Sequence, residues 1–202
     1  MIADTATIEA GAQLGTGVLV EDFVVVRAGA IVGDGCYLRA GTIVYSEAVL
    51  RSSVQTGHHV VIRSGSVVGE GTLIGTHTVL DGDLSIGRHC RLQTAVYVPP
   101  GCTIGDRCFL GPGASLTNDR RAGSHMRGLS QAGDAWQGAT LGYGVRVGAR
   151  AVLLDGISLG DECFVAAGAV VTRSVAAGRL VRGVPAVDVG AVPPGEELPD
   201  HD

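Results

Sequence analysis

A six-residue period of aliphatic side chains is the feature that most constrains how this chain can fold. Every sixth residue from Ile2 to Leu116 is aliphatic except Thr56, and the period resumes in a new frame from Leu141 to Val171. A helix face repeats every ~3.6 residues and a half-buried strand repeats every second residue, so neither element explains a period of six. The sequence therefore predicts short extended pieces joined by corners, with three pieces closing one triangular coil.

Small side chains four residues after each aliphatic residue support the triangular coil. All five cysteines occupy this position, which predicts that they are core residues without a disulfide or metal role: Cys36, Cys90, Cys102, Cys108 and Cys163. Glycine often follows the aliphatic residue directly and predicts tight corners with unusual backbone angles, as at Gly15, Gly33, Gly69, Gly75, Gly87 and Gly105.

Composition restricts the functional class. The 202 residues suit one domain, and aromatic residues make up only 4%, as a narrow interior requires. A formal net charge of -5 argues against nucleic-acid or anionic-membrane partners. Glycine or polar corners interrupt every apolar stretch, and the residues after Met1 lack the pattern of a signal peptide. We therefore expect a cytoplasmic protein.

One long interruption of the repeat carries the densest set of chemical groups. Residues 117–140 are predicted to form a loop that leaves the prism, and loops on rigid scaffolds commonly carry function. The predicted domain is 1–186, a β-helix with this loop, and residues 187–202 are predicted to be a disordered tail because they are acidic and rich in proline.

The repeat pattern over roughly residues 2–176 resembles the hexapeptide-repeat superfamily of acyltransferases. The resemblance implies an all-β, left-handed parallel β-helix of hexapeptide repeats with one long loop excursion. The segments Gly111–Asp119 and Gly138–Gly142 look most like the nucleotide-amino-sugar N-acetyltransferases. That branch uses acetyl-CoA as the acyl donor and an amino group of a nucleotide-linked sugar as the acceptor, and it implies a homotrimer.

The resemblance also implies site residues. The acceptor is expected near Gln93, Thr94, Asn118 and Asp119, although the chain has Gln93-Thr94-Ala95 where the amino-sugar enzymes usually have Gln-Asn-Asn. The final repeats are similar to the acyl-CoA-binding end of the superfamily. Cofactor contacts are therefore expected at Gly142, Gly148, Ala166, Ala167, Arg173 and Pro185, with Arg146 and Arg150 as further candidates for phosphate binding. A backbone N–H around Gly142 or Gly148 is the expected donor to the oxyanion.

Two histidines are candidates for the general base that such a reaction can use. Residues eighteen positions apart should stack in adjacent coils, about 4.8 Å apart, so His59, His77 and Ala95 should form one column. This places His77 beside Thr94 and one coil from Gln93. His125 in the loop is the second candidate, because a loop from one subunit could reach the corner of the next.

The replacement at Thr94 and Ala95 leaves open a non-catalytic scaffold or a degenerate acyltransferase. Two other functions also remain open from the sequence. One is an O-acyltransferase that modifies a small hydroxyl acceptor. The other is a metal-dependent hydratase resembling the γ-type carbonic anhydrases, for which His59 and His77 would begin the zinc site. The closely spaced histidine pair of that family is absent after His77, so no metal ligands are predicted.

Overall fold

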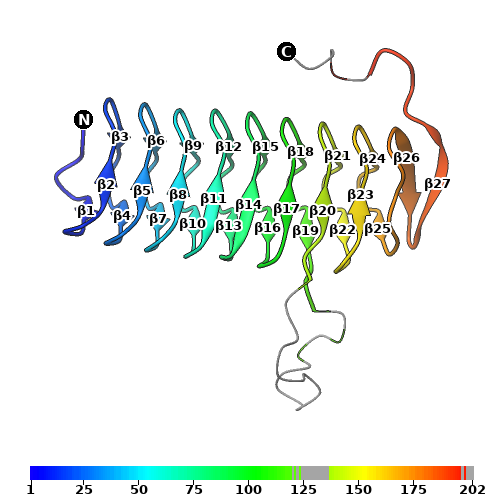
Figure 1. The fold of residues 1–202 in the computed structure, drawn as a ribbon, viewed down its shortest axis with the longest axis horizontal. Helices are drawn as coiled ribbons and strands as arrows, with labels where there is room; N and C mark the ends of the chain where they lie inside the picture. Colours follow the sequence, from blue (N-terminus) through cyan, green and yellow to red (C-terminus); the bar gives the residue numbers. More distant parts are fainter. Residues whose placement is uncertain (120, 122, 124–136, 197, 199–202) are drawn as a thin grey trace.

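A computed structural model describes residues 1–119, 121, 123, 137–196 and 198. Over these residues the chain winds into a three-sided prism whose coils stack along the long axis (Figure 1). This confirms the predicted all-β, left-handed parallel β-helix of hexapeptide repeats. The described part of the chain contains no helix that could cross a membrane.

Each side of the prism is one sheet, and the described strands are assigned as follows. Sheet I contains β1 (Thr7–Ile8), β4 (Val25–Val26), β7 (Ile43–Val44), β10 (Val61–Ile62), β13 (Val79–Leu80), β16 (Tyr97–Val98), β19 (Ser115–Leu116), β22 (Val152–Leu153) and β25 (Val170–Val171). Sheet II contains β2 (Gln13–Leu14), β5 (Ile31–Val32), β8 (Val49–Leu50), β11 (Ser66–Val68), β14 (Leu84–Ile86), β17 (Thr103–Ile104), β20 (Thr140–Leu141) and β23 (Ser158–Leu159). Sheet III contains β3 (Leu19–Val20), β6 (Tyr37–Leu38), β9 (Gln55–Thr56), β12 (Leu73–Ile74), β15 (Arg91–Leu92), β18 (Phe109–Leu110), β21 (Arg146–Val147), β24 (Phe164–Val165), β26 (Arg179–Gly183) and β27 (Ala186–Ala191).

The register of the sheets is the register that the period of six predicts. Strands pair in parallel with a partner eighteen positions away, as Leu73 does with Arg91. Across the loop the offset grows, so that Thr103 pairs with Thr140. The loop is therefore inserted at one corner and leaves the ladder on both sides intact.

The aliphatic residues of the period form the core. Those between Val20 and Val171 are buried, whereas Ile2 is 49% exposed because no coil covers the N-terminal end of the prism. Thr56, the exception in the repeat, is also fully buried. Its hydroxyl lies 3.0 Å from the Thr42 hydroxyl and accepts a hydrogen bond from the Arg39 amide, which offsets the cost of burying it.

Threonine and cysteine side chains at the small inward position share one structural role. The Thr72 hydroxyl donates to the Gly87 carbonyl at 2.9 Å, and the Cys90 thiol donates to the Gly105 carbonyl at 3.1 Å. All five cysteines are free and buried, and burial raises the pKa of Cys102 to about 11. The prediction that the cysteines are core residues is confirmed.

The reason we expected for the corner glycines was wrong. Gly33 and Gly75 do not have positive φ angles, and the left-handed conformation falls two residues later, at Gly35 and His77. Glycine is needed at this position because the backbone of the next coil lies too close to leave room for a Cβ atom. A Cβ atom on Gly75 would lie 2.4 Å from the carbonyl carbon of Gln93.

The prediction of a disordered tail from residue 187 was also wrong in part. Residues 187–191 belong to β27, which pairs antiparallel with β26 and covers the C-terminal end of the prism. The Arg179 guanidinium pairs with the Asp188 carboxylate at 2.7 Å, and Val192 is buried. The sequence pattern did not indicate this hairpin because the period of six ends before it.

Candidate functional site

The three corners of the prism differ in chemistry, and each runs along the whole stack. The histidine edge is the corner from sheet III to sheet I, and it carries His58, His59 and His77. The loop edge is the corner from sheet I to sheet II, where residues 117–119 follow β19 and residues 137–139 precede β20 (Figure 1). The corner from sheet II to sheet III is the third edge.

The predicted column of histidines forms on the histidine edge. The rings of His59 and His77 stack with centroids 5.3 Å apart and planes 7° apart. His59, His77 and Ala95 share the left-handed backbone conformation, with φ of 53°, 58° and 58°, so they occupy one turn position in successive coils. The imidazole of His77 is exposed and free to meet a ligand beside Thr94.

Several predicted site residues lie on the same edge. Gln93 and Thr94 follow β15, Gly148 follows β21, and Ala166 and Ala167 follow β24, so successive coils place them in one line with His77. Pro185 lies in the turn between β26 and β27, at the end of sheet III that borders this edge. The histidine edge therefore joins the predicted base, part of the acceptor site and most of the cofactor site.

The other predicted residues are not on this edge. Gly142 follows β20 and lies on the third edge, and the exposed Arg173 follows β25 and lies on the loop edge. Asn118 and Asp119 also lie on the loop edge, across the width of sheet I from His77. Within one chain the acceptor residues are therefore not brought together as expected.

The base of the loop is held locally. The Asn118 side-chain amide donates to the Pro100 carbonyl at 3.1 Å, and the Asp119 carboxylate accepts hydrogen bonds from the Arg121 and Gly123 amides. His125, the second candidate for the base, lies outside the described residues.

A backbone donor was expected around Gly142 or Gly148, and the amides of these two glycines themselves are engaged. The Gly142 amide donates to Leu159 at 2.9 Å and the Gly148 amide donates to Val165 at 2.7 Å, both within the ladder. The next amide in each corner of the histidine edge points away from the ladder instead. Among the described residues, the amide N–H groups of Thr94, Ala149 and Ala167 have no acceptor. These three amides are among the donors available to a ligand on this edge.

A carboxylate near the histidines was not predicted. Glu21 Oε2 lies 3.8 Å from Nε2 of His58, and Glu21 also accepts hydrogen bonds from the Tyr37 hydroxyl and the Ala40 amide. The Tyr37 hydroxyl, followed by the Ala40 amide, lowers the pKa of Glu21, so its carboxylate is ionised beside the imidazole. The signal was present in the sequence, because Glu21 occupies the same repeat position as Arg39, Gly57, Gly75 and Gln93.

The arginines proposed for phosphate binding have different surroundings. Arg146 lies over the Phe164 ring at 4.6 Å, and its Nη1 pairs with Glu196 of the C-terminal segment at 3.0 Å. Arg150 lies at the histidine edge, directly after Ala149, and is exposed. Arg150 is therefore the arginine placed to meet an anionic group on the histidine edge.

In the described part of the chain, we find no set of side chains placed to bind a metal ion. No group of three or more His, Cys, Asp and Glu side chains there is arranged to hold an ion. His59 and His77 stack face to face.

Comparisons with known proteins agree with this fold. The model of the bacterial transferase hexapeptide with six repeats matches residues 83–118, and the model of the hexapeptide repeat of succinyl-transferase matches residues 138–173. A 2,3,4,5-tetrahydropyridine-2,6-dicarboxylate N-acetyltransferase of Staphylococcus aureus (strain JH9) is 52% identical over 42 residues, which are 21% of this chain and 18% of the relative. The chain thus matches less than a fifth of the length of such relatives.

Solved structures show the same architecture. A UDP-N-acetylglucosamine acyltransferase from Bacteroides fragilis 9343 superposes with a TM-score of 0.60 and 16% identity, over 95% of this chain and 75% of that one. A hexapeptide-repeat acetyltransferase from Vibrio cholerae, solved with acetyl coenzyme A, superposes with a TM-score of 0.50 and 23% identity. The match covers 64% of this chain and 72% of that one. The period of six, the triangular coil and the two repeat models that flank the loop show that this chain is built from hexapeptide repeats wound into a left-handed parallel β-helix, and both matching models describe repeats of transferases.

Proposed function

We propose that this protein is an acyl-CoA-dependent N-acetyltransferase that acts on an amino group of a nucleotide-linked sugar. The observation that carries the proposal is the line of groups on the histidine edge, where His77, Thr94, Ala149 and Ala167 occupy the same corner in four of five consecutive coils. This line supplies a base and free backbone donors along one surface, which is what transfer from a long thioester to an amine requires.

The names of similar proteins support the same reaction class. The S. aureus relative is named as an N-acetyltransferase, and the V. cholerae structure is a complex with acetyl coenzyme A. The B. fragilis structure is named as an acyltransferase of a nucleotide sugar. These names favour an acyl-CoA donor and a nucleotide-sugar acceptor.

The residues on the histidine edge suggest how the reaction proceeds. Acetyl-CoA, the donor substrate, supplies the acetyl group as a thioester. His77 accepts a proton from the attacking amine as the nitrogen bonds to the carbonyl carbon. The free amide of Thr94, one coil from His77, donates to the oxygen that becomes negative, and the Ala149 amide further along the edge is a donor to the rest of acetyl-CoA. The carbon–sulfur bond then breaks, and the imidazolium returns the proton to the leaving thiolate.

A homotrimer would complete the acceptor site. Asn118 and His77 lie at opposite edges of sheet I, so one chain does not place both beside the same acceptor. A closed three-fold ring uses heterologous interfaces, so it brings one edge of a subunit next to a different edge of its neighbour. We therefore propose that the loop edge of one subunit faces the histidine edge of the next.

A thermal-shift screen tests the proposed function. Acetyl-CoA at about 100 times its Kd is expected to add about 2.7 kcal/mol of stability, which corresponds to a rise in Tm of roughly 5–10 °C for a chain of this size. A panel of amino-sugar nucleotides should give further shifts. Transfer is then measured by mass spectrometry of the acetylated product, because a thiol reagent would also react with the protein's own cysteines on unfolding.

The same screen separates the alternatives. A fall in Tm on adding a zinc chelator, with no response to acetyl-CoA, would replace the proposal with a metal-dependent reaction. Acetylation of a hydroxyl compound in place of every amino sugar would make the enzyme an O-acyltransferase. Each outcome identifies the reaction class without depending on any single residue.

The Ala149→Pro variant tests the role of a free backbone donor. Proline lacks an amide N–H, and Pro112 already occupies the equivalent turn position one coil earlier, so the fold should accept the change. Loss of one neutral hydrogen bond is expected to weaken acetyl-CoA binding about 2- to 10-fold, as measured by isothermal titration calorimetry. Ala177→Pro, at the same turn position of the third edge, should leave binding unchanged. Equal affinity in both variants would remove the Ala149 amide from the donor site.

A further inference from the structure

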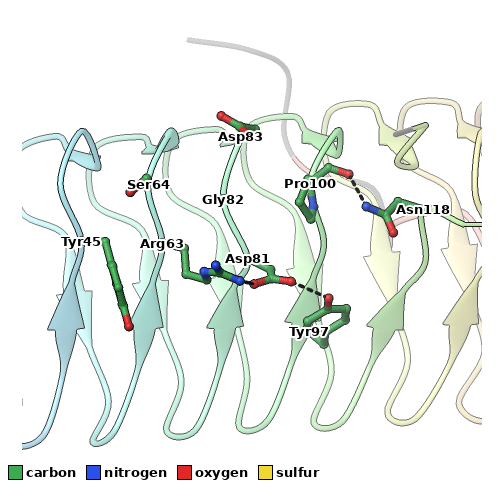
Figure 2. Close-up of a pocket in the computed structure, with 9 residues that line it drawn as sticks. All are labelled: Tyr45, Arg63, Ser64, Asp81, Gly82, Asp83, Tyr97, Pro100 and Asn118. Carbon is green, nitrogen blue, oxygen red and sulfur yellow. Dashed lines mark hydrogen bonds and ion pairs between the residues drawn. The ribbon is translucent and has the colours of Figure 1, made fainter. Parts of the chain in front are cut away.

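A groove on the loop edge shares only Asn118 with the residues used above. Five successive coils line it, and it encloses about 450 Å³. We call it the loop-edge groove and define it by Tyr45, Arg63, Asp81, Asp83, Tyr97 and Asn118 (Figure 2). Sheet I separates it from the histidine edge of the same chain.

One side of the groove is fixed by an internal network. The Arg63 guanidinium pairs with Oδ1 of Asp81 at 2.7 Å, and the Tyr97 hydroxyl donates to Oδ2 of Asp81 at 2.8 Å (Figure 2). Burial, followed by the hydrogen bond to Asp81, raises the pKa of Tyr97 to about 12. Asp81 therefore uses both oxygens to hold its neighbours, and the ring of Tyr97, in a side chain that is 37% exposed, stays available as a contact surface.

Other polar groups of the groove are unused. The carboxylate of Asp83 is exposed and has no hydrogen bond or ion pair with any described residue. The side-chain amide nitrogen of Asn118 donates a hydrogen bond to the Pro100 carbonyl. The side-chain carbonyl oxygen of Asn118 therefore remains available as an acceptor. An ionised carboxylate accepts hydrogen bonds only, so these two groups select a ligand that donates hydrogen bonds.

Charge and aromatic surface narrow the ligand class. Arg63 contributes one positive charge, whereas Asp81 and Asp83 contribute two negative charges, so the lining carries a formal charge of -1. Such a lining repels phosphate groups and accepts a neutral or cationic ligand. The ring of Tyr97, in the coil between those of Asp83 and Asn118, offers an apolar face on which a sugar ring can pack.

We propose that the loop-edge groove binds a sugar ring that carries an amine, with its hydroxyl and ammonium groups donating to Asp83 and Asn118. The identity of this sugar as the acceptor rests on the proposed function, but binding itself does not. The diphosphate of a nucleotide-linked acceptor would lie outside the groove, because the groove lining is negative.

Binding of free glucosamine to the full chain tests this inference by saturation-transfer NMR, with no acyl donor present. The wild-type protein should transfer saturation to the sugar ring, and inorganic pyrophosphate should not compete. Asp83→Asn is expected to weaken binding about tenfold or more, because it removes a charged acceptor, and asparagine tolerates the positive φ of 43° at this position.

Glu47→Gln is the matched control. Glu47 occupies the same turn position of the loop edge, has a φ of 63°, and lies outside the groove lining. The inference is overturned if glucosamine gives no saturation transfer, if pyrophosphate displaces it, or if Glu47→Gln weakens binding as much as Asp83→Asn. Sugar binding without any acetyl transfer would contradict the proposed function but support the groove as a sugar-binding site. Acetyl transfer with no sugar binding at the groove would support the proposed function and contradict the groove as a sugar-binding site.

Discussion

Replacement of His77 by asparagine is expected to lower kcat about 100-fold or more and to leave the KM for acetyl-CoA nearly unchanged. A positioned general base contributes roughly 10²–10⁴ to a rate, and asparagine cannot accept the proton of an amine. Asparagine suits the φ of 58° at this position, so the coil should keep its shape. The measurement is steady-state kinetics with the best acceptor from the screen, together with Tm as a check on folding.

His89→Asn is the matched control for this variant. His89 has the same left-handed backbone, with a φ of 54°, but it lies on the third edge after β14. Its replacement should leave kcat within about twofold of the wild-type value, since it contacts no part of the proposed site. If His77→Asn behaves like His89→Asn, the base is another group, and His58 beside Glu21 becomes the next residue to replace.

Much of the histidine edge could be predicted from the sequence because the coil length is fixed. Residues eighteen positions apart fall in one column, so the stack of His59 on His77 follows from counting. The same counting would have separated Asn118 from His77. Ile74 and Leu116 are 42 residues apart, or seven hexads, and seven is not a multiple of three. The corner after Ile74, which carries His77, is therefore a different edge of the prism from the corner after Leu116, which carries Asn118. The assignment of Asn118 to the acceptor site rested on the resemblance and did not take this separation into account.

Other parts of the site could not be read from the period of six. The pairs between Arg63 and Asp81 and between Asp81 and Tyr97 depend on which side chains lean toward each other across coils, and the period fixes positions but not rotamers. The hairpin of β26 and β27 lies beyond the repeat. The backbone donor could be predicted only as lying around Gly142 or Gly148, because the sequence does not show which amide of a corner faces outward.

The Ile74→Ala variant is expected to lower the free energy of unfolding by about 2–5 kcal/mol, because it opens a cavity in a core that is closely packed. Ile74 is fully buried between Thr56 and Leu92 of the adjacent coils, and it lies three residues before His77. Each coil of a solenoid is stabilised mainly by its neighbours, so the loss should concentrate around the coil that carries the histidine. Denaturant unfolding, with hydrogen exchange to locate the weakened coil, provides the measurement.

Leu73→Ala is the control within the same two-residue strand, β12. Leu73 points outward and is only partly buried, so its truncation should cost less than about 1 kcal/mol. The difference between the two neighbours is the energetic signature of a strand whose alternate side chains face the core and the surface. A Leu73→Ala cost equal to or larger than that of Ile74→Ala would mean that the inward frame is misassigned, and the placement of His77 on an exposed edge would be lost with it.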